Sequence, residues 1–326
     1  MKISSLSDIS RPINEELEEF SHLFKASLKS NVALVDLITR YILKQKGKKI
    51  RPLLVLLSAK ASGGITQRSY RGATLVELLH SATLIHDDVV DNAEERRGFP
   101  SINAVWKNKI AVLMGDYMLS RGLSLALDGN DFDFLKVITN TVKRMSEGEL
   151  LQISKTRKLD IDEETYYRII SDKTASLIST CCEVGAMSAT QNPEMIEALH
   201  SFGENLGIAF QIKDDILDYT GVTLITGKPK GGDIKEKKIT LPLIHTLKKS
   251  GKQEAQQIIK LVKESGKKGR IQEVIDFVKL NGGIEFSLQE AKRFGDKAKN
   301  SISTLVDSPS KEALFNLVDF VIERSK

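Results

Sequence analysis

Two short acidic motifs constrain this chain more than any other feature of its sequence. Both have the form Asp-Asp-x-x-Asp, at Asp87-Asp88-Val89-Val90-Asp91 and at Asp214-Asp215-Ile216-Leu217-Asp218, and each follows a run of apolar residues. On a helix, like charges three or four residues apart repel each other by about 0.2–0.5 kcal/mol per pair. Carboxylates are also rarely buried without a partner. The two clusters therefore indicate a counter-charge, and hard divalent cations, which prefer oxygen ligands, are the natural candidates.

Either motif alone is compatible with a solvated helix end, because short acidic patterns occur by chance. Two copies with the same spacing and a similar apolar lead-in are harder to explain in that way. Asp87 and Asp214 lie too far apart in the sequence for one local loop such as an EF-hand. We therefore expect two helices that face each other across a cavity.

Composition limits the class of protein. The chain has 326 residues, of which 41% are hydrophobic and 28% charged, as expected of a soluble protein with a substantial core. No apolar run is long enough to cross a membrane, and the N-terminus lacks the apolar segment of a signal peptide. The two cysteines, Cys181 and Cys182, are adjacent in an apolar helical context, which favours a reduced, cytoplasmic protein.

The net charge of +5 could help to attract an anionic substrate or a membrane surface. No basic run is interleaved with aromatic residues, so a nucleic-acid partner is not expected. Apolar residues recur at steps of three and four along most of the chain, and no stretch alternates with a period of two. We predict an all-α fold, a single helical domain over residues 1–326, with a Gly- and Pro-rich flexible lid at residues 226–235.

Side chains suited to bind phosphate lie near the acidic motifs. His80 precedes Asp87 by seven residues, which is two helical turns, so the two side chains share a face. Gln211 shares a face with the second motif for the same reason. Arg holds phosphate with paired hydrogen bonds and Lys acts as a point charge. Further candidates in the sequence are Lys48, Arg51, Arg96, Arg97, Lys173 and Thr174.

Each of these residues also has an ordinary structural explanation. A lone His on an apolar helix is usually a hydrogen-bonded core residue, and Arg pairs are usually solvated. Their combination is more informative than any one of them. Acidic clusters would hold metal while separate cationic groups would bind phosphate.

The order of the motifs resembles that of the trans-prenyltransferases, the polyprenyl diphosphate synthases. The resemblance extends over residues 47–242. It rests on Gly47-Lys48-Lys49-Ile50-Arg51-Pro52, Glu77-Leu78-Leu79-His80, the first acidic motif with Arg96-Arg97-Gly98, Gly148-Glu149, Lys173-Thr174, Phe210-Gln211 with the second acidic motif, and Lys238-Ile239-Thr240-Leu241-Pro242. It implies a large helical bundle of the isoprenoid synthase type, with a central cavity between the two Asp-rich helices.

The resemblance also implies a role for each residue. Asp87, Asp91 and Asp214 would hold Mg²⁺ ions on the diphosphate of an allylic substrate, supported by Asp88, Asp215 and Asp218 as ligands or through water. The allylic side of the site would be contacted by Arg96, Lys173, Gln211 and Lys238. The diphosphate of isopentenyl diphosphate would be bound by Lys48, Arg51, His80 and Arg97. Thr174 and Gln211 would also direct oxygen dipoles toward a carbocation.

Two positions depart from the family pattern. Lys237 stands where the family usually has Gly before the lysine of the late motif, so either Lys237 or Lys238 could contact phosphate. Residues 228–232 carry extra charge, and Lys228 is a further candidate.

Product length should depend on the residues four and five positions before Asp87. These are Thr83 and Ala82, where short-chain members tend to have a bulky aromatic residue. A small Ala favours a deeper path for the growing tail, closed by Phe132, Phe134 or Ile138, although Ala82 could instead be a tight packing position. We therefore predict a long-chain all-trans polyprenyl diphosphate that supplies quinone side chains.

Other readings remain open. The nearest is a short-chain farnesyl or geranylgeranyl diphosphate synthase. A terpene cyclase would not need the second diphosphate site, and a non-catalytic regulatory subunit would be expected to have lost acidic ligands. The family analogy further implies a homodimer and at most transient membrane contact when the apolar product is released.

Overall fold

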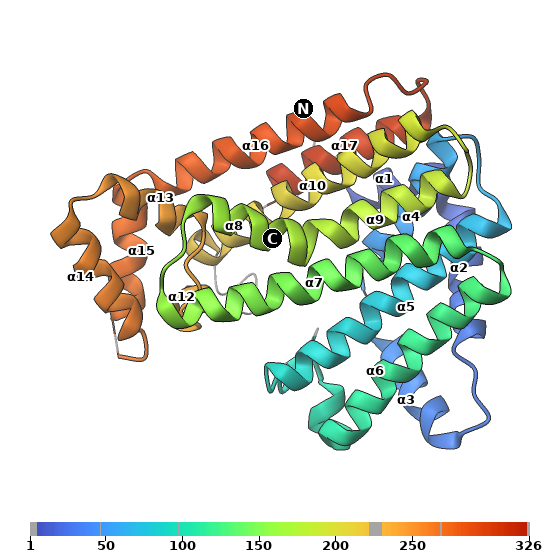
Figure 1. Cartoon of the computed structure of the whole chain (residues 1–326), viewed down its shortest axis with the longest axis horizontal. Coiled ribbons are helices and arrows are strands. Elements are labelled where there is room, and N and C mark those ends of the chain that lie inside the picture. Colours follow the sequence, from blue (N-terminus) through green and yellow to red (C-terminus); the bar gives the residue numbers. More distant parts are fainter. Residues whose placement is uncertain (1–4, 46, 97, 222–229, 268, 325–326) are drawn as a thin grey trace.

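The computed structural model describes residues 5–45, 47–96, 98–221, 230–267 and 269–324. Within these ranges the chain is almost entirely helical, which confirms the all-α prediction (Figure 1). The helices up to the first acidic motif are α1 (Leu6–Ser10), followed by a 3₁₀ turn (Arg11–Ile13), α2 (Asn14–Ser27), α3 (Ala33–Lys44), α4 (Ile50–Ala61) and α5 (Gln67–Val90). The helices between the two motifs are α6 (Ile102–Asp128), α7 (Phe132–Lys158), α8 (Glu163–Ile170), a π-turn (Ser171–Ala175), α9 (Ser176–Met187) and α10 (Pro193–Thr220). The remaining helices are α12 (Gly232–Lys235), α13 (Leu241–Lys249), α14 (Lys252–Lys263), α15 (Arg270–Leu280), α16 (Gly283–Ser301) and α17 (Pro309–Glu323).

A small antiparallel hairpin follows the first acidic motif. Its strands β1 (Glu95–Arg96) and β2 (Phe99–Pro100) are two residues long, with Glu95 opposite Pro100 and Arg96 opposite Phe99. Strands this short show no period-two pattern in the sequence. The hairpin turns the chain from the end of α5 into α6 and holds Arg96 beside the motif.

Helix α5 carries the first acidic motif at its C-terminal end. It begins with a capping box in which the Thr66 and Ser69 side chains each accept a hydrogen bond from the other residue's backbone N–H. Along its length α5 packs closely on α6, where a Cβ on Gly122 would lie 3.2 Å from a Leu75 methyl group. The small residue lets the two helices approach, and this contact fixes the rotation of α5.

Helix α10 carries the second acidic motif in its last turns. Its start is set by Asn192, whose side chain accepts from the N–H groups of Glu194 and Met195, and by Pro193 at the first helical position. Gly203 and Gly207 allow α10 to pack closely against α9 and the π-turn. A Cβ on either glycine would lie 2.5 Å from a backbone Cα of the neighbouring segment.

The buried apolar residues form three clusters. One joins α4, α7, α9, α17 and the first half of α10, and a second joins the other half of α10 to α8, α13, α15 and α16. The third lies between the outer face of α5 and helices α3 and α6. Helices α5 and α10 each contribute to two clusters, so the positions of both acidic motifs depend on the whole core.

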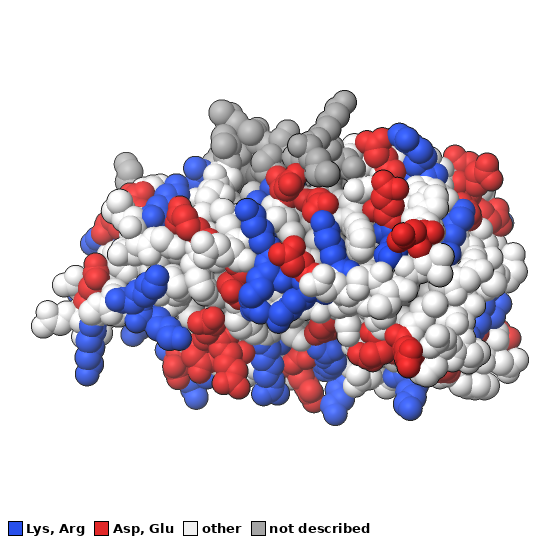
Figure 2. Space-filling view, turned by 90° about the horizontal axis from the view of Figure 1, so that it is seen from above, with Lys and Arg blue, Asp and Glu red and all other residues white. Residues whose placement is uncertain are grey.

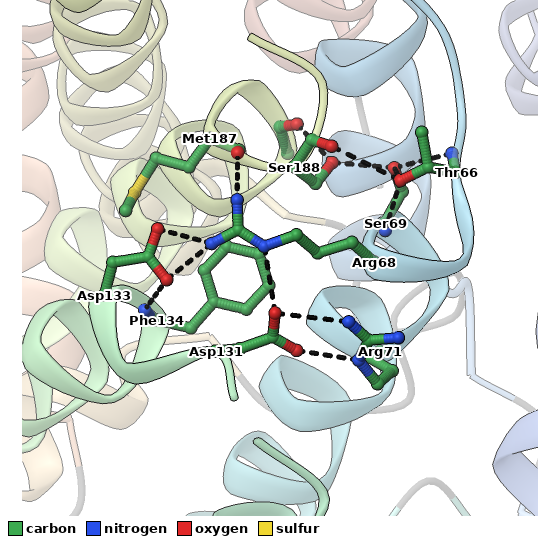
Figure 3. A network of polar contacts seen from close by, with 10 residues as sticks. Thr66, Arg68, Ser69, Arg71, Asp131, Asp133, Phe134, Met187 and Ser188 are labelled. Carbon is green, nitrogen blue, oxygen red and sulfur yellow. Dashed lines mark hydrogen bonds and ion pairs between the residues drawn. The ribbon is translucent and has the colours of Figure 1, made fainter. Parts of the chain in front are cut away.

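An ion-pair network fixes the end of α5 that is opposite to the motif (Figure 3). The Arg68 guanidinium donates from Nε to Asp131 Oδ1 at 2.9 Å and from Nη1 to the Met187 carbonyl at 2.6 Å, and it also pairs with Asp133. It lies 4.3 Å from the ring centroid of Phe134. This network joins α5 to the start of α7 and the end of α9.

The residues expected to close the product tail differ in their burial. Phe134 and Ile138 are fully buried in the same cluster as Leu75 and Leu79. Phe132 is 61% exposed, so the expectation that it closes the tail's path is wrong. It is the first residue of α7, and its side chain leaves the core there.

Helix α6 is the one helix in the described residues that is long and apolar enough to cross a membrane. One of its faces packs on α5, and its exposed residues include Val105, Val112, Leu113 and Leu127.

Lys and Arg side chains are interspersed with Asp and Glu on the face of the molecule that Figure 2 shows.

Candidate active site

Three carboxylates gather at the C-terminal end of α5. Asp87 and Asp91 are exposed and four residues apart, so they share a face, whereas Asp88 is buried. A helix C-terminus carries partial negative charge, which disfavours carboxylates there unless a cation is near. The last turn of α5 contains no basic side chain. The required positive charge must therefore come from other elements or from a bound ion.

The surroundings of Asp87 show which elements meet here. Asp87 is exposed at the surface, but the surrounding elements partly desolvate its carboxyl and so raise its pKa, and the negative charges of Glu149 and Asp91 raise it further. The cations Lys173 and Arg96 act in the opposite direction. Helix α7 and the π-turn therefore face the end of α5. Lys173 Nζ lies 2.5 Å from Glu149 Oε2 and donates to Gln152 Oε1 at 3.0 Å.

Asp88 makes a different contact from those of the other two aspartates in the motif. Its Oδ1 accepts from Arg96 Nε at 2.8 Å and from Arg96 Nη2 at 2.5 Å. The carboxylate is 3% exposed, so the ion pair is largely shielded from water. Asp88 therefore orients the guanidinium of Arg96.

The aspartates of the second motif, on α10, also point in different directions. Asp214 pairs with Arg324 Nη2 at 2.6 Å, at the C-terminal end of the described chain. Asp215 is buried and accepts from Tyr166 Oη at 2.6 Å and from Gln211 Nε2 at 2.9 Å. Asp218 accepts from two backbone N–H groups at the start of α12, those of residues 232 and 233, at 3.0 and 3.2 Å.

Asp233 adds a further carboxylate to this end of α10. Burial raises the pKa of Asp233 to about 6, with a contribution from the negative charge of Asp218, while Lys238 acts in the opposite direction. The pKa of Asp215 is raised well above its usual value by burial and by the charge of Asp233. The carboxylates around α12 therefore repel one another in the absence of a cation.

A pocket lies beside the acidic end of α10, and its two lysines interact electrostatically with Asp87 and Asp91 of the first motif. It contains Lys173, Thr174, Gln211 and Lys238, which are four of the five residues predicted to be catalytic. The fifth, Arg96, lines a neighbouring pocket. The other residues lining the first pocket are Gln152, Thr156, Ile161, Tyr166, Ile169, Ile170, Asp215, Asp233, Ile239 and Thr240.

A π-turn presents Lys173 and Thr174 to the pocket. The turn spans Ser171–Ala175 and widens the helix between α8 and α9 by one residue. Such turns are frequent at functional sites because they redirect side chains without ending the helix. Thr174 Oγ1 donates to Gln211 Oε1 at 2.9 Å, which connects the π-turn to α10.

Lys238 lies between the two acidic motifs. Burial lowers the pKa of Lys238, but Glu236, Asp233 and Asp91 together raise it above its usual value. Lys237 is exposed and has a φ of 60°, the left-handed region that favours glycine. The departure from the family's Gly therefore places a strained residue beside the pocket, and of the two adjacent lysines it is Lys238 that lines the pocket. Lys228 lies outside the described residues.

A second site lies on the other side of α5, where two pockets share Ile42, Gln45, Glu77 and Ser81. His80, Asp88 and Arg96 line one of them, and Lys25 and Lys49 line the other.

Three of the residues predicted to bind the second diphosphate are described in the structure, and of these three His80 alone lines these pockets. Lys48 is exposed, and Arg51 lies in the first turn of α4. Arg97 lies outside the described residues. Lys49 is the N-cap residue of α4 and has a φ of 49°, and its Nζ donates to Ser21 Oγ at 2.6 Å.

Several residues of the site were not assigned a role from the sequence. They are Lys49, Tyr166, Asp233 and Arg324. Lys49 lies in the stretch 47–52 and Asp233 in the stretch 226–235, both of which the sequence analysis named. Their charges could have indicated a role in the site. Tyr166 and Arg324 reach the site through tertiary packing and carry no local signature.

The carboxylates suit a hard cation, because the donors at both helix ends are oxygens. Among the described residues, no three His, Cys, Asp or Glu side chains converge on one point as a ready-made metal site. A hard divalent cation held by one or two of these carboxylates would complete its coordination with waters and substrate phosphates.

An all-helical fold with two Asp-rich helix ends beside a cationic pocket defines an enzyme of the isoprenoid synthase type. The model of the polyprenyl synthetase family matches residues 32–278. The chain belongs to the polyprenyl synthetase family and is a trans-prenyltransferase.

Individual relatives cover nearly the whole chain. The octaprenyl diphosphate synthase of Haemophilus influenzae is 32% identical over 323 residues, which are 99% of this chain and 98% of that protein. A polyprenyl synthase from Caulobacter crescentus, solved in complex with calcium and isoprenyl diphosphate, has a TM-score of 0.92 at 31% identity over 100% of both chains. A geranylgeranyl pyrophosphate synthase from Bacteroides thetaiotaomicron has a TM-score of 0.83 at 37% identity, covering 98% of this chain and 99% of that one.

Proposed function

We propose that this enzyme condenses isopentenyl diphosphate head-to-tail with an allylic diphosphate and releases a long-chain all-trans polyprenyl diphosphate. The observation that carries the proposal is the pair of adjacent sites. One contains Lys173 and Lys238, and the other consists of two adjoining pockets, of which one contains His80 and the other Lys49. Two separate cationic pockets suit two diphosphate substrates, whereas a cyclase would need one.

The proposed metal ligands are Asp87 and Asp91 on α5 and Asp214 on α10. The carboxylates of Asp88, Asp215 and Asp218 are occupied by Arg96, by Tyr166 and Gln211, and by the start of α12. Asp214 also pairs with Arg324, but its side chain is 41% exposed, whereas Asp88 and Asp215 are buried and both oxygens of Asp218 accept from the start of α12. We therefore assign Asp88, Asp215 and Asp218 a supporting role. Bound Mg²⁺ would supply positive charge that stabilises the diphosphate as it leaves the allylic carbon.

The chain's own residues account for the remaining chemistry. Lys173 and Lys238 stabilise negative charge on the leaving diphosphate. Thr174 and Gln211 direct oxygen dipoles toward the allylic carbon, where positive charge develops. The double bond of isopentenyl diphosphate, bound beside His80, attacks this carbon. Loss of a proton then gives an allylic diphosphate one isoprene unit longer, and the departed diphosphate is the proposed acceptor.

The long-chain assignment depends on Ala82. Its side chain is 2% exposed and packs with Leu78, Met114 and Met118 between α5 and α6. A Phe at this position would fill the space beside α5 below the first motif. We expect Ala82→Phe to shorten the products. An unchanged product spectrum from folded Ala82→Phe enzyme would contradict the proposed path of the tail.

The function is tested by incubating the enzyme with Mg²⁺, isopentenyl diphosphate and farnesyl diphosphate and measuring product length by mass spectrometry. Long polyprenyl diphosphates support the proposal. Products that stop after one added unit would favour the short-chain alternative, and no product with any allylic primer would favour a regulatory subunit. Asp87→Ala should abolish turnover with unchanged helical circular dichroism. Normal turnover in that variant would contradict the metal role.

We also propose that two copies associate through α6 and that the enzyme is cytoplasmic. The exposed fractions of Val112 and Leu113 are 40% and 55%, an unusual degree of apolar exposure for adjacent residues. Leu113→Glu should therefore convert a dimer into monomers in light scattering. A monomeric wild-type enzyme would contradict this assembly, and binding of the wild type to lipid vesicles would indicate that the α6 face contacts membranes.

A further inference from the structure

The hydroxyl of Tyr166 lies at one end of a continuous chain of hydrogen bonds. Tyr166, on α8, is 3% exposed and donates from Oη to Asp215 Oδ2 at 2.6 Å. The other oxygen of Asp215 accepts from Gln211 Nε2 at 2.9 Å, and Gln211 Oε1 accepts from Thr174 Oγ1 at 2.9 Å. All four residues line the pocket beside the acidic end of α10.

The chemistry of the partners gives this chain one direction. An amide nitrogen can only donate, so Gln211 Nε2 donates to Asp215 Oδ1, while the Tyr166 hydroxyl donates to Asp215 Oδ2. The amide nitrogen of Gln211 is thereby committed to Asp215, and its oxygen must face Thr174. Thr174 has one hydroxyl proton and gives it to that oxygen. The remaining lone pairs of the Thr174 oxygen are then available to the pocket.

We propose that Tyr166 and Asp215 are positioning residues for the prenyl transfer. They hold the Gln211–Thr174 pair in the orientation that presents oxygen dipoles to the developing allylic cation. This inference rests on the proposed function. Dipoles that are fixed before the reaction stabilise developing charge more effectively than dipoles that must reorient. Without the Tyr166 hydroxyl, one oxygen of Asp215 loses its partner and the carboxylate and the Gln211 amide are free to turn.

The adjacent Tyr167 provides a matched control. Its hydroxyl also donates to a carboxylate, Glu290 Oε2, at 2.7 Å. Tyr167 lines an outer groove with Ile244 and Lys248 and does not line the catalytic pocket. The two Tyr→Phe variants therefore remove the same kind of hydrogen bond from the same helix, but only one removes it from the pocket.

The first experiment compares kcat and KM of the wild type, Tyr166→Phe and Tyr167→Phe with isopentenyl and farnesyl diphosphates. We expect Tyr166→Phe to lower kcat by about ten- to a hundredfold, the range for residues that orient a functional group. The KM for isopentenyl diphosphate should change by less than about threefold in Tyr166→Phe, because this substrate is proposed to bind in the second site, beside His80. Tyr167→Phe should have the kcat and KM of the wild type. An inactive wild type would refute the proposed function. An active wild type with an unaffected Tyr166→Phe variant would refute only this inference.

A double-mutant cycle with Asp215→Asn tests whether Tyr166 acts through Asp215. If it does, the Tyr166→Phe/Asp215→Asn double variant should lose no more activity than the more damaged single variant. Losses that multiply would show that Tyr166 acts independently and would overturn the proposal. If Tyr166→Phe also lowers the melting temperature, the kcat of Asp215→Asn, measured below the Tm of that variant, tests the proposal instead. A similar loss of kcat supports the proposal, and a wild-type rate contradicts it.

Discussion

Replacing Gly207 with Ala tests how closely catalysis depends on the packing of α10. Gly207 lies where α10 crosses the π-turn that carries Lys173 and Thr174. A Cβ at this position would lie 2.5 Å from Ala175 Cα and 2.8 Å from Ala175 Cβ. Both distances are well below ordinary carbon–carbon contact, so the π-turn and α10 must separate by about 1 Å.

The effect on stability should be modest. Overpacking of this kind typically costs about 1–3 kcal/mol. Ala is favoured over Gly inside a helix by about 1 kcal/mol, which offsets part of that cost. We expect a net loss of about 1–2 kcal/mol in the free energy of unfolding, seen as a fall of a few degrees in Tm. The effect on activity should be larger, because a 1 Å displacement of catalytic groups can lower the rate by about 100-fold.

Gly203→Ala is the matched control, because its Cβ would lie 2.5 Å from Ser179 Cα, one turn away from the catalytic residues. The assay measures Tm by circular dichroism and kcat at a temperature well below both midpoints. Both variants should lose similar stability, but only Gly207→Ala should lose about 100-fold in kcat. A Gly207→Ala enzyme with wild-type kcat, or an equal loss in Gly203→Ala, would refute the reasoning.

Three further predictions concern stability. Lys237→Gly should stabilise the fold by about 0.5–1 kcal/mol in thermal denaturation, since Lys237 has a φ of 60°; destabilisation would contradict this. The hydrogen bond from His200 to Glu183 raises the pKa of His200, so this pair contributes stability below about pH 6.5 and loses it as pH rises through the raised pKa. The stability difference between wild type and His200→Gln should therefore shrink from pH 6 to pH 8.5, and a growing difference would show the opposite linkage. Asp131→Ala should lower the free energy of unfolding by about 2–4 kcal/mol in chemical denaturation, because it removes the 2% exposed carboxylate that Arg68 and Arg71 share. A loss below about 0.5 kcal/mol would show that the network in Figure 3 does not stabilise the fold.

Local sequence patterns predicted the elements that carry the chemistry. The apolar period of the segment ending at Asp87 predicts a buried helix, and the spacing of Asp87 and Asp91 places both carboxylates on one face. The same reasoning places Gln211 beside Asp215 on α10, where the structure shows their hydrogen bond. These predictions succeed because residues three and four positions apart on a helix are neighbours whatever the rest of the chain does.

The different contacts of the aspartates within each motif could be known only from the tertiary structure. Asp87 and Asp88 are adjacent in sequence, but the packing of α5 on α6 leaves one exposed and buries the other against Arg96. The contact between Asp214 and Arg324 joins residues that are far apart in the chain, and no local pattern indicates it.

The sequence by itself determined the helical class, the two acidic helix ends and the kinds of ligand they suit, because these depend on short-range periodicity and charge. Only the tertiary structure decided that Asp215 and Asp233 line the first pocket, and that a π-turn presents Thr174 to Gln211. It also decided that Lys238 rather than Lys237 lines the first site and that Lys49 rather than Lys48 lines the second. Those outcomes depend on the rotation and separation of packed helices, and small residues such as Gly122 and Gly207, acting with distant partners, set both.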